Sequence, residues 1–147
     1  MKKRLIALIL TLTLYASLYA PEYRSVPIFP GEIIYHIRPD ELYRMLFIYK
    51  IKHPEIVWKQ AMLETGWIKS PISKEGKNLF GMKYNNRGFC SGEKYGHASY
   101  DTYYHSLADY KAWQDNYYKG GDYYEFLIRI GYAEDNNYIE KLKQIKY

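Results

Sequence analysis

The stretch PEIVWKQAMLETGW, residues 54–67, decides the fold expected of this chain. Pro54 suits the first position of a helix, and Gly66 can adopt the left-handed conformation that ends one. The stretch therefore predicts a helix over Pro54–Thr65. In its last turn Glu64 has apolar neighbours, and both burial and the helix dipole would raise the pKa of its carboxyl group. A carboxyl group that stays protonated near neutral pH can act as a general acid. On this stretch alone, a solvated glutamate is the simpler interpretation.

Helical patterns lie on both sides of this stretch. An apolar stripe predicts a helix that starts near Asp40. Further along, Ser106 opens a capping box for another helix, and Asp122 and Asp135 can each cap a shorter one. The middle of the chain, Ile68–Tyr100, is rich in glycine and asparagine, which favours loops with one small hairpin. The sequence predicts one mostly helical α+β domain with an irregular or β-hairpin lobe.

The first twenty residues have the order of a secretory signal: basic residues, an apolar run and small residues. We expect cleavage of residues 1–20, with an uncleaved anchor as the alternative. An extended arm over 21–39 and a catalytic domain over 40–147 would remain, exported to the periplasm, the cell wall or the medium. Loss of three basic residues lowers the formal net charge from +5 to +2, so we expect no nucleic-acid partner. We also expect no membrane span after cleavage, and a monomer.

Other chemistries have little support in the sequence. The single cysteine, Cys90, cannot form an internal disulfide, and a thiol-protease interpretation would rest on composition alone. The four histidines lack the spacing of a metal site, so we expect no metal and no other cofactor. The chain has 19 tyrosines. Aromatic rings can stack on the faces of sugar rings, although most of these rings are expected to fill the core.

Four short motifs follow one another along the chain. They are QAMLETGW at 60–67, NLFGMK at 78–83, YDTYYHSLADY at 100–110 and GYAEDNNY at 131–138. In this order they resemble the glucosaminidase family, glycoside hydrolase family 73, over about Glu41–Ile145. The ordered set favours the catalytic interpretation of Glu64 over the solvated one.

This resemblance implies a lysozyme-like fold. It also implies hydrolysis, without a metal, of the β-1,4 bond between N-acetylglucosamine and N-acetylmuramic acid in a peptidoglycan glycan strand. Glu64 matches the catalytic acid, and Tyr132 matches a cleft tyrosine that orients the acetamido group or the attacking water. Asn78 and Phe80 match the element that shapes the cleft floor. Further candidates for sugar contact are Trp67, Tyr100 and Tyr103.

The second catalytic group stays open. Many family members carry another glutamate on a longer β-hairpin, and Glu93 is the nearest match here, with Asp101 as another nearby carboxylate. Two carboxyl groups about 5–5.5 Å apart favour retention and about 6.5–9.5 Å favour inversion, while the substrate's acetamido group is a third possibility. Alternatives to a glucosaminidase are a non-catalytic wall-binding module of the same fold, a muramidase or a lytic transglycosylase.

Overall fold

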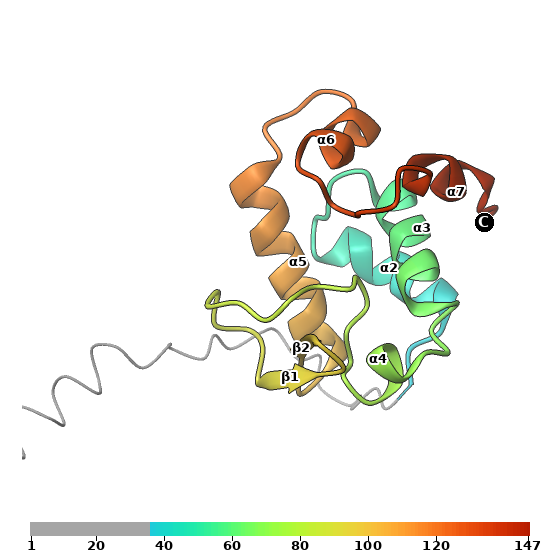
Figure 1. Cartoon of the computed structure of the whole chain (residues 1–147). Helices are drawn as coiled ribbons and strands as arrows, with labels where there is room; N and C mark the ends of the chain where they lie inside the picture. Colours follow the sequence, from blue (N-terminus) through green and yellow to red (C-terminus); the bar gives the residue numbers. More distant parts are fainter. Residues whose placement is uncertain (1–35) are drawn as a thin grey trace, which may run out of the picture.

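The computed structural model describes residues 36–147 (Figure 1). The expected leader and residues 21–35 of the expected arm lie outside the described residues, so these boundaries stay predictions. The elements are α2 (Pro39–Ile48), α3 (Pro54–Thr65), α4 (Pro71–Lys74), β1 (Gly92–Lys94), β2 (His97–Ser99), α5 (Tyr103–Tyr117), α6 (Tyr123–Arg129) and α7 (Tyr138–Gln144). The predicted mostly helical α+β class with a small hairpin is confirmed. Within residues 36–147, no helix combines the length and the apolar character needed to cross a membrane.

α3 has the ends that the sequence predicts. Pro54 is its first residue, and Gly66 follows its last residue with a φ of 54°. The backbone N–H groups of Gly66 and Trp67 donate to the carbonyls of Leu63 and Met62, which satisfies the end of the helix. α3 packs against both α2 and α7.

α5 begins one turn before the predicted capping box, so the box is wrong. Its N-cap is Thr102, whose side chain accepts the His105 N–H. Ser106 is fully buried inside the helix, and its hydroxyl accepts the Leu79 N–H at 3.1 Å. The Ser106 hydroxyl, which the local sequence pattern assigns to a helix cap, therefore binds the distant backbone of Leu79 instead.

The last two helices differ in how well their starts are predicted. Asp122 caps α6, since its Oδ1 accepts the Glu125 N–H at 2.9 Å. The prediction that Asp135 caps the last helix is wrong, because α7 starts at Tyr138 with Asn137 as its N-cap. Asp135 instead forms a turn, in which its Oδ1 accepts the Asn137 N–H and its carbonyl accepts the Tyr138 N–H. This turn sets the position of Tyr138, a residue of the site described below.

The hairpin pairs Gly92 with Ser99, Glu93 with Ala98 and Lys94 with His97. Tyr95 and Gly96 form its two-residue turn with φ values of 54° and 70°, the arrangement of a type I′ turn. The Ala98 N–H donates to the Met82 carbonyl at 2.9 Å. This bond ties the hairpin to the segment that follows α4.

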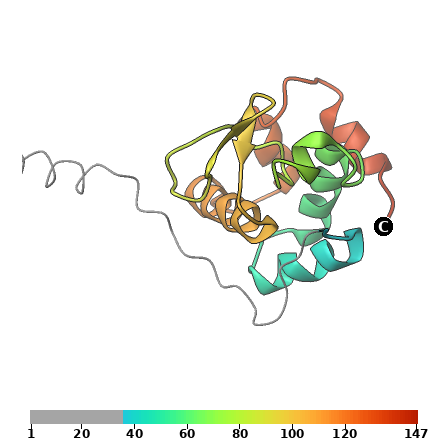
Figure 2. The same ribbon diagram turned by 90° about the horizontal axis from the view of Figure 1, so that it is seen from below.

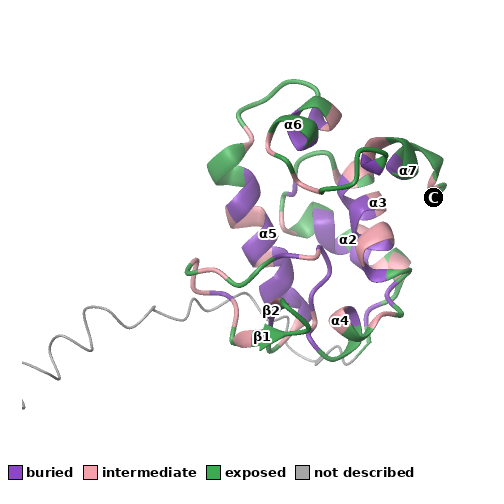
Figure 3. Ribbon diagram, viewed as in Figure 1, coloured by how far each residue is buried: buried purple, intermediate pink, exposed green. Residues whose placement is uncertain are grey.

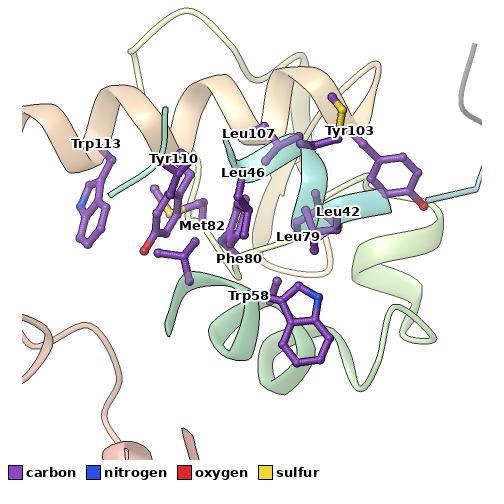
Figure 4. Close-up of a cluster of buried hydrophobic side chains, with 14 of the residues drawn as sticks. Leu42, Leu46, Trp58, Leu79, Phe80, Met82, Tyr103, Leu107, Tyr110 and Trp113 are labelled. Atoms are coloured by element: carbon purple, nitrogen blue, oxygen red, sulfur yellow. The ribbon is translucent and has the colours of Figure 1, made fainter. Parts of the chain in front are cut away.

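The core lies where α2, α3 and α5 face one another (Figure 3). Seen from below, α2 and the hairpin lie at opposite edges of the domain (Figure 2). Figure 4 shows the buried side chains that α5 contributes in succession, together with those of the segment after α4. The labelled ones from these two parts are Tyr103, Leu107, Tyr110, Trp113, Leu79, Phe80 and Met82.

Candidate active site

A pocket of about 670 Å³ opens at the C-terminal end of α3. It is lined by α3, the segment after α4, strand β2, helix α5 and the connection between α6 and α7. Its lining residues are Glu64, Phe80, Gly81, Met82, Lys83, Tyr84, Asn85, Arg87, His97, Trp113, Ile130, Gly131, Tyr132, Ala133 and Glu134. We call it the Glu64 pocket.

Glu64 is half-buried in this pocket. Its Oε1 accepts a hydrogen bond of 2.9 Å from the Tyr138 hydroxyl. Burial raises the pKa of Glu64 above its ordinary value of 4.5, while the Tyr138 hydrogen bond and the nearby His97 partly offset this effect. The net direction is the one that a general acid needs.

Gly81 lies against the Glu64 carboxyl group. Its φ of 65° is in the left-handed region, which favours glycine. A Cβ atom at this position would lie 2.8 Å from Oε2 of Glu64 and 3.3 Å from its Cδ. The carboxyl group therefore occupies space that any larger residue at position 81 would take.

Tyr132 lines the pocket close to Glu64. Its hydroxyl donates a 2.7 Å hydrogen bond to the Phe80 carbonyl, and its ring packs against those of Trp113 and Tyr138 with centroids 5.3 Å and 5.8 Å away. Burial raises the pKa of Tyr132 well above its ordinary value, so the hydroxyl keeps its proton. Because this proton is already donated to the Phe80 carbonyl, the phenol oxygen can only accept hydrogen bonds from groups in the pocket.

Asn78 organises the pocket floor from behind. It is fully buried, and its amide group donates to the carbonyls of Met82 and Ala98 at 2.9 and 2.8 Å. Its Oδ1 accepts the N–H groups of Phe80 and Met82, both at 3.2 Å. Asn78 thus holds the Phe80 backbone that Tyr132 binds, although its own side chain lies outside the pocket lining.

Glu93 is exposed on β1 and lies outside the pocket lining. It pairs with Ala98, whereas His97 is the residue of β2 that lines the pocket. Side chains alternate between the two faces of a strand, so Glu93 lies on the face of the hairpin opposite to His97. The carboxylates in the pocket lining are Glu64 and Glu134.

The three predicted sugar-contacting residues also lie outside the pocket lining. Tyr100 and Tyr103 are only 4% and 2% exposed, so they are core residues. The Tyr100 hydroxyl donates to buried Asp109 at 2.7 Å. Trp67 is 47% exposed and packs edge-on against Trp58. Of the predicted site residues, the pocket brings together Glu64, Phe80 and Tyr132.

Several pocket residues were missed by sequence reasoning. Gly81 lies in the pocket lining, and Tyr138 lies outside that lining but bonds to Glu64. Both belong to the quoted motifs, so their motif positions were the available signal. His97, Trp113 and Glu134 had no local signal, because only the packing of distant segments brings them to the pocket.

Charges of both signs line the pocket. Arg87 bonds to fully buried Asp109, with 2.5 Å between Nε and Oδ1, so its charge is largely neutralised. Lys83 is exposed and donates to the Gly96 carbonyl at 3.1 Å. Within residues 36–147, no group of three or more His, Cys, Asp or Glu side chains could hold a metal ion.

The family model described as glucosaminidase, mannosyl-glycoprotein endo-beta-N-acetylglucosaminidase, matches residues 41–147. The chain belongs to the glucosaminidase family. The resemblance stated from the four motifs is thereby confirmed, and the architecture is that of a lysozyme-like glucosaminidase domain. Membership in this family supports glycoside hydrolase activity, with peptidoglycan as the implied substrate. No curated protein and no solved structure matches the chain.

Proposed function

We propose that this glucosaminidase domain is an exported peptidoglycan hydrolase that cleaves the β-1,4 bond between N-acetylglucosamine and N-acetylmuramic acid. The observation that carries the proposal is the half-buried Glu64, with its raised pKa, at the wall of a pocket of about 670 Å³. This volume lies within the about 300–1,000 Å³ of ordinary ligand sites. Export is inferred from the composition of residues 1–20 alone.

In the proposed reaction Glu64 is the general acid. Its Oε1 accepts the Tyr138 hydrogen bond, so the acidic proton is carried by Oε2, beside Gly81. The proton passes to the glycosidic oxygen while the bond from that oxygen to the anomeric carbon breaks. Glu64 is then a carboxylate, and it regains a proton from water before the next cycle.

The anomeric carbon must be attacked from its other side. The exposed position of Glu93, opposite to His97, argues against a direct role for Glu93. Asp101, the other nearby carboxylate, is also exposed and lies outside the pocket lining. Two candidates remain: the substrate's own acetamido group, and a water molecule deprotonated by Glu134. The first gives retention and the second inversion at the anomeric carbon, so the anomer released first distinguishes them.

Tyr132 is proposed to orient the substrate. Its hydroxyl oxygen can accept a hydrogen bond, so it suits the N–H of an acetamido group or an attacking water. Tyr84 is an exposed aromatic residue of the same lining and suits stacking on a sugar ring. These two residues replace Tyr100 and Tyr103 as the proposed aromatic contacts.

The proposal is tested with Glu64→Gln and defined muropeptide chains, using mass spectrometry to identify the products. We expect wild type to release fragments with N-acetylglucosamine at the reducing end, and Glu64→Gln to lose at least about a hundredfold in rate because no acid remains. Glu93→Gln is the matched variant outside the pocket and should keep its activity. Thermal melting of all three proteins checks that each one folds.

Other results would replace the proposal. N-acetylmuramic acid at the new end, reducing or anhydro, would assign a muramidase or a lytic transglycosylase instead. Tight binding of wild type to purified walls without release of sugar would assign a binding module. Full activity of Glu64→Gln would remove Glu64 from the mechanism.

A further inference from the structure

A line of hydrogen-bonded side chains runs through the interior from α5 to Glu64. Neighbouring members are 2.9 Å (Gln114 to Tyr123), 2.8 Å (Tyr123 to Tyr110), 2.7 Å (Tyr110 to Gln60), 3.5 Å (Gln60 to Tyr138) and 2.9 Å (Tyr138 to Glu64) apart. We call it the Gln114–Glu64 network. It connects α5, α6, α3 and α7, the helices that carry these residues.

Every member before Glu64 is buried. Polar groups removed from water cost free energy unless they are paired. Within the described part of the chain, no buried side-chain nitrogen or oxygen lacks a hydrogen-bond partner. The polar groups of the Gln114–Glu64 network are thus fully paired, and the network ends on the proposed catalytic acid.

The hydroxyl protons of this network have one consistent direction. A tyrosine hydroxyl has a single proton to donate. Tyr138 donates its proton to Oε1 of Glu64, and Tyr110 donates its proton to Oε1 of Gln60. The bond between Tyr110 and Tyr123 must then be donated by Tyr123. Each proton therefore points toward Glu64.

The far end of the network is fixed by the backbone. The Lys52 N–H donates to Oε1 of Gln114 at 2.7 Å, and Nε2 of Gln114 donates to the Lys52 carbonyl at 2.9 Å. These two bonds set the orientation of the Gln114 amide, so Nε2 is the atom that donates to Tyr123. The direction of the whole network follows from this anchor.

We propose that Tyr138 and Gln60 are positioning residues of the acid: Tyr138 holds Oε1 of Glu64, and Gln60 keeps the Tyr138 hydroxyl turned toward it. The inference rests on the proposed role of Glu64 as general acid. With Oε1 held in this way, Oε2 is the oxygen that presents the proton to the pocket.

This arrangement predicts a specific pH effect. The Tyr138 bond lowers the pKa of Glu64, against the larger effect of burial. The other titratable and charged groups of the pocket are Lys83, Tyr84 and Arg87 from the segment after α4, His97 from β2, and Tyr132 and Glu134 from the connection after α6. Tyr138→Phe changes none of these groups. Loss of its hydroxyl therefore raises the pKa of Glu64 further.

The experiment compares wild type with Tyr138→Phe in the full chain. The first readout is the pH dependence of kcat on defined muropeptide chains, and the second is the titration of the Glu64 carboxyl carbon by NMR, assigned with Glu64→Gln. Activity falls as pH rises through the pKa of a general acid. We expect Tyr138→Phe to move both this fall in kcat and the NMR titration of Glu64 to higher pH, by about half a pH unit to one pH unit.

Two more variants separate positioning from folding. Gln60→Met removes the group that donates to the Tyr138 hydroxyl. It should also move the fall in kcat to higher pH, but by less, because the bond from Gln60 to Tyr138 is the longest of the network at 3.5 Å. Tyr118→Phe is the matched control. Its hydroxyl bonds to His53 and to the Gly121 carbonyl, outside the network, so its pH profile should stay at the wild-type position.

Coincident titrations of Glu64 in wild type and Tyr138→Phe would overturn the proposal, even if Tyr138→Phe melts at a lower temperature. An unchanged titration in Gln60→Met would overturn the part of the proposal that concerns Gln60. The NMR titration needs no turnover. If wild type is inactive but Tyr138→Phe still shifts the Glu64 titration, the proposed function fails while the contact between Tyr138 and Glu64 stands.

Discussion

Substituting Gly81 with alanine should displace the Glu64 carboxyl group without removing any polar group from the pocket. The new Cβ atom would lie 2.8 Å from Oε2 and 3.3 Å from Cδ of Glu64. Ordinary van der Waals contact begins at 3.4 Å, so the carboxyl group or the backbone at Gly81 must move by about 0.6 Å. Oε2 is the oxygen that carries the proton in the proposed mechanism.

Two separate costs follow from this change. An alanine at a φ of 65° is strained, which lowers the free energy of unfolding by about 1–2 kcal/mol. The displaced carboxyl group lowers the rate, because a misplacement of about 1 Å can cost about a hundredfold. For about 0.6 Å we expect a loss in kcat of roughly ten- to a hundredfold.

Gly96→Ala is the matched control. Its φ of 70° imposes the same backbone strain, and nothing lies within 4 Å of a Cβ atom at this position. Both variants should lose similar stability in urea titrations, and only Gly81→Ala should lose kcat on defined muropeptide chains. Equal kcat values for the two variants at matched stability would refute the reasoning, because the contact with Glu64 would then have no effect on catalysis.

Two further predictions concern stability. The raised pKa of Glu64 means that the folded state binds this proton more tightly than the unfolded state, so stability falls as pH rises from about 4.5 through the raised pKa. Thermal melts should therefore show Glu64→Gln gaining stability relative to wild type as pH rises across this window, by about 1.4 kcal/mol for each unit by which folding raises the pKa. A stability difference between the two proteins that does not change with pH would contradict this. Asp109→Ala should lower the free energy of unfolding in urea by about 3 kcal/mol, the low end of the range for a broken buried ion pair, because Arg87 keeps 21% exposure. A loss below about 0.5 kcal/mol, as for an ordinary surface change, would show that the pair is not needed.

Helix ends were predictable where the chain carries its own signal. Pro54 and Gly66 act through backbone geometry, so α3 ends where the sequence predicts. Ser106 was misassigned because Thr102, one turn earlier, is an equally good cap. The choice between them depends on the Leu79 N–H that binds Ser106, and that contact exists only in the folded domain.

The tyrosines show why the site was only partly predictable. Most rings were expected to fill the core, and Tyr110 and Tyr123 do so, but Tyr100, predicted to contact a sugar, is a core residue as well. A buried tyrosine needs a partner for its hydroxyl, and here Asp109 and Gln60 provide partners from distant positions. No local pattern reveals such pairs. Glu64 was predicted as the acid because its motif and its position in α3 point to the same role, and it lines the pocket.

The second catalytic group could not be predicted from the sequence either, because it depends on which face of the hairpin each side chain occupies. The turn at Tyr95 and Gly96 fixes the register, which pairs Lys94 with His97 on one face of the hairpin. His97 lines the pocket, so β1 presents Lys94 on that face, while Glu93 lies on the other. Among the residues that line the pocket, Glu134, in the connection after α6, is then the carboxylate left to activate water. If Glu134→Gln keeps full activity as well, the acetamido group of the substrate is left as the nucleophile.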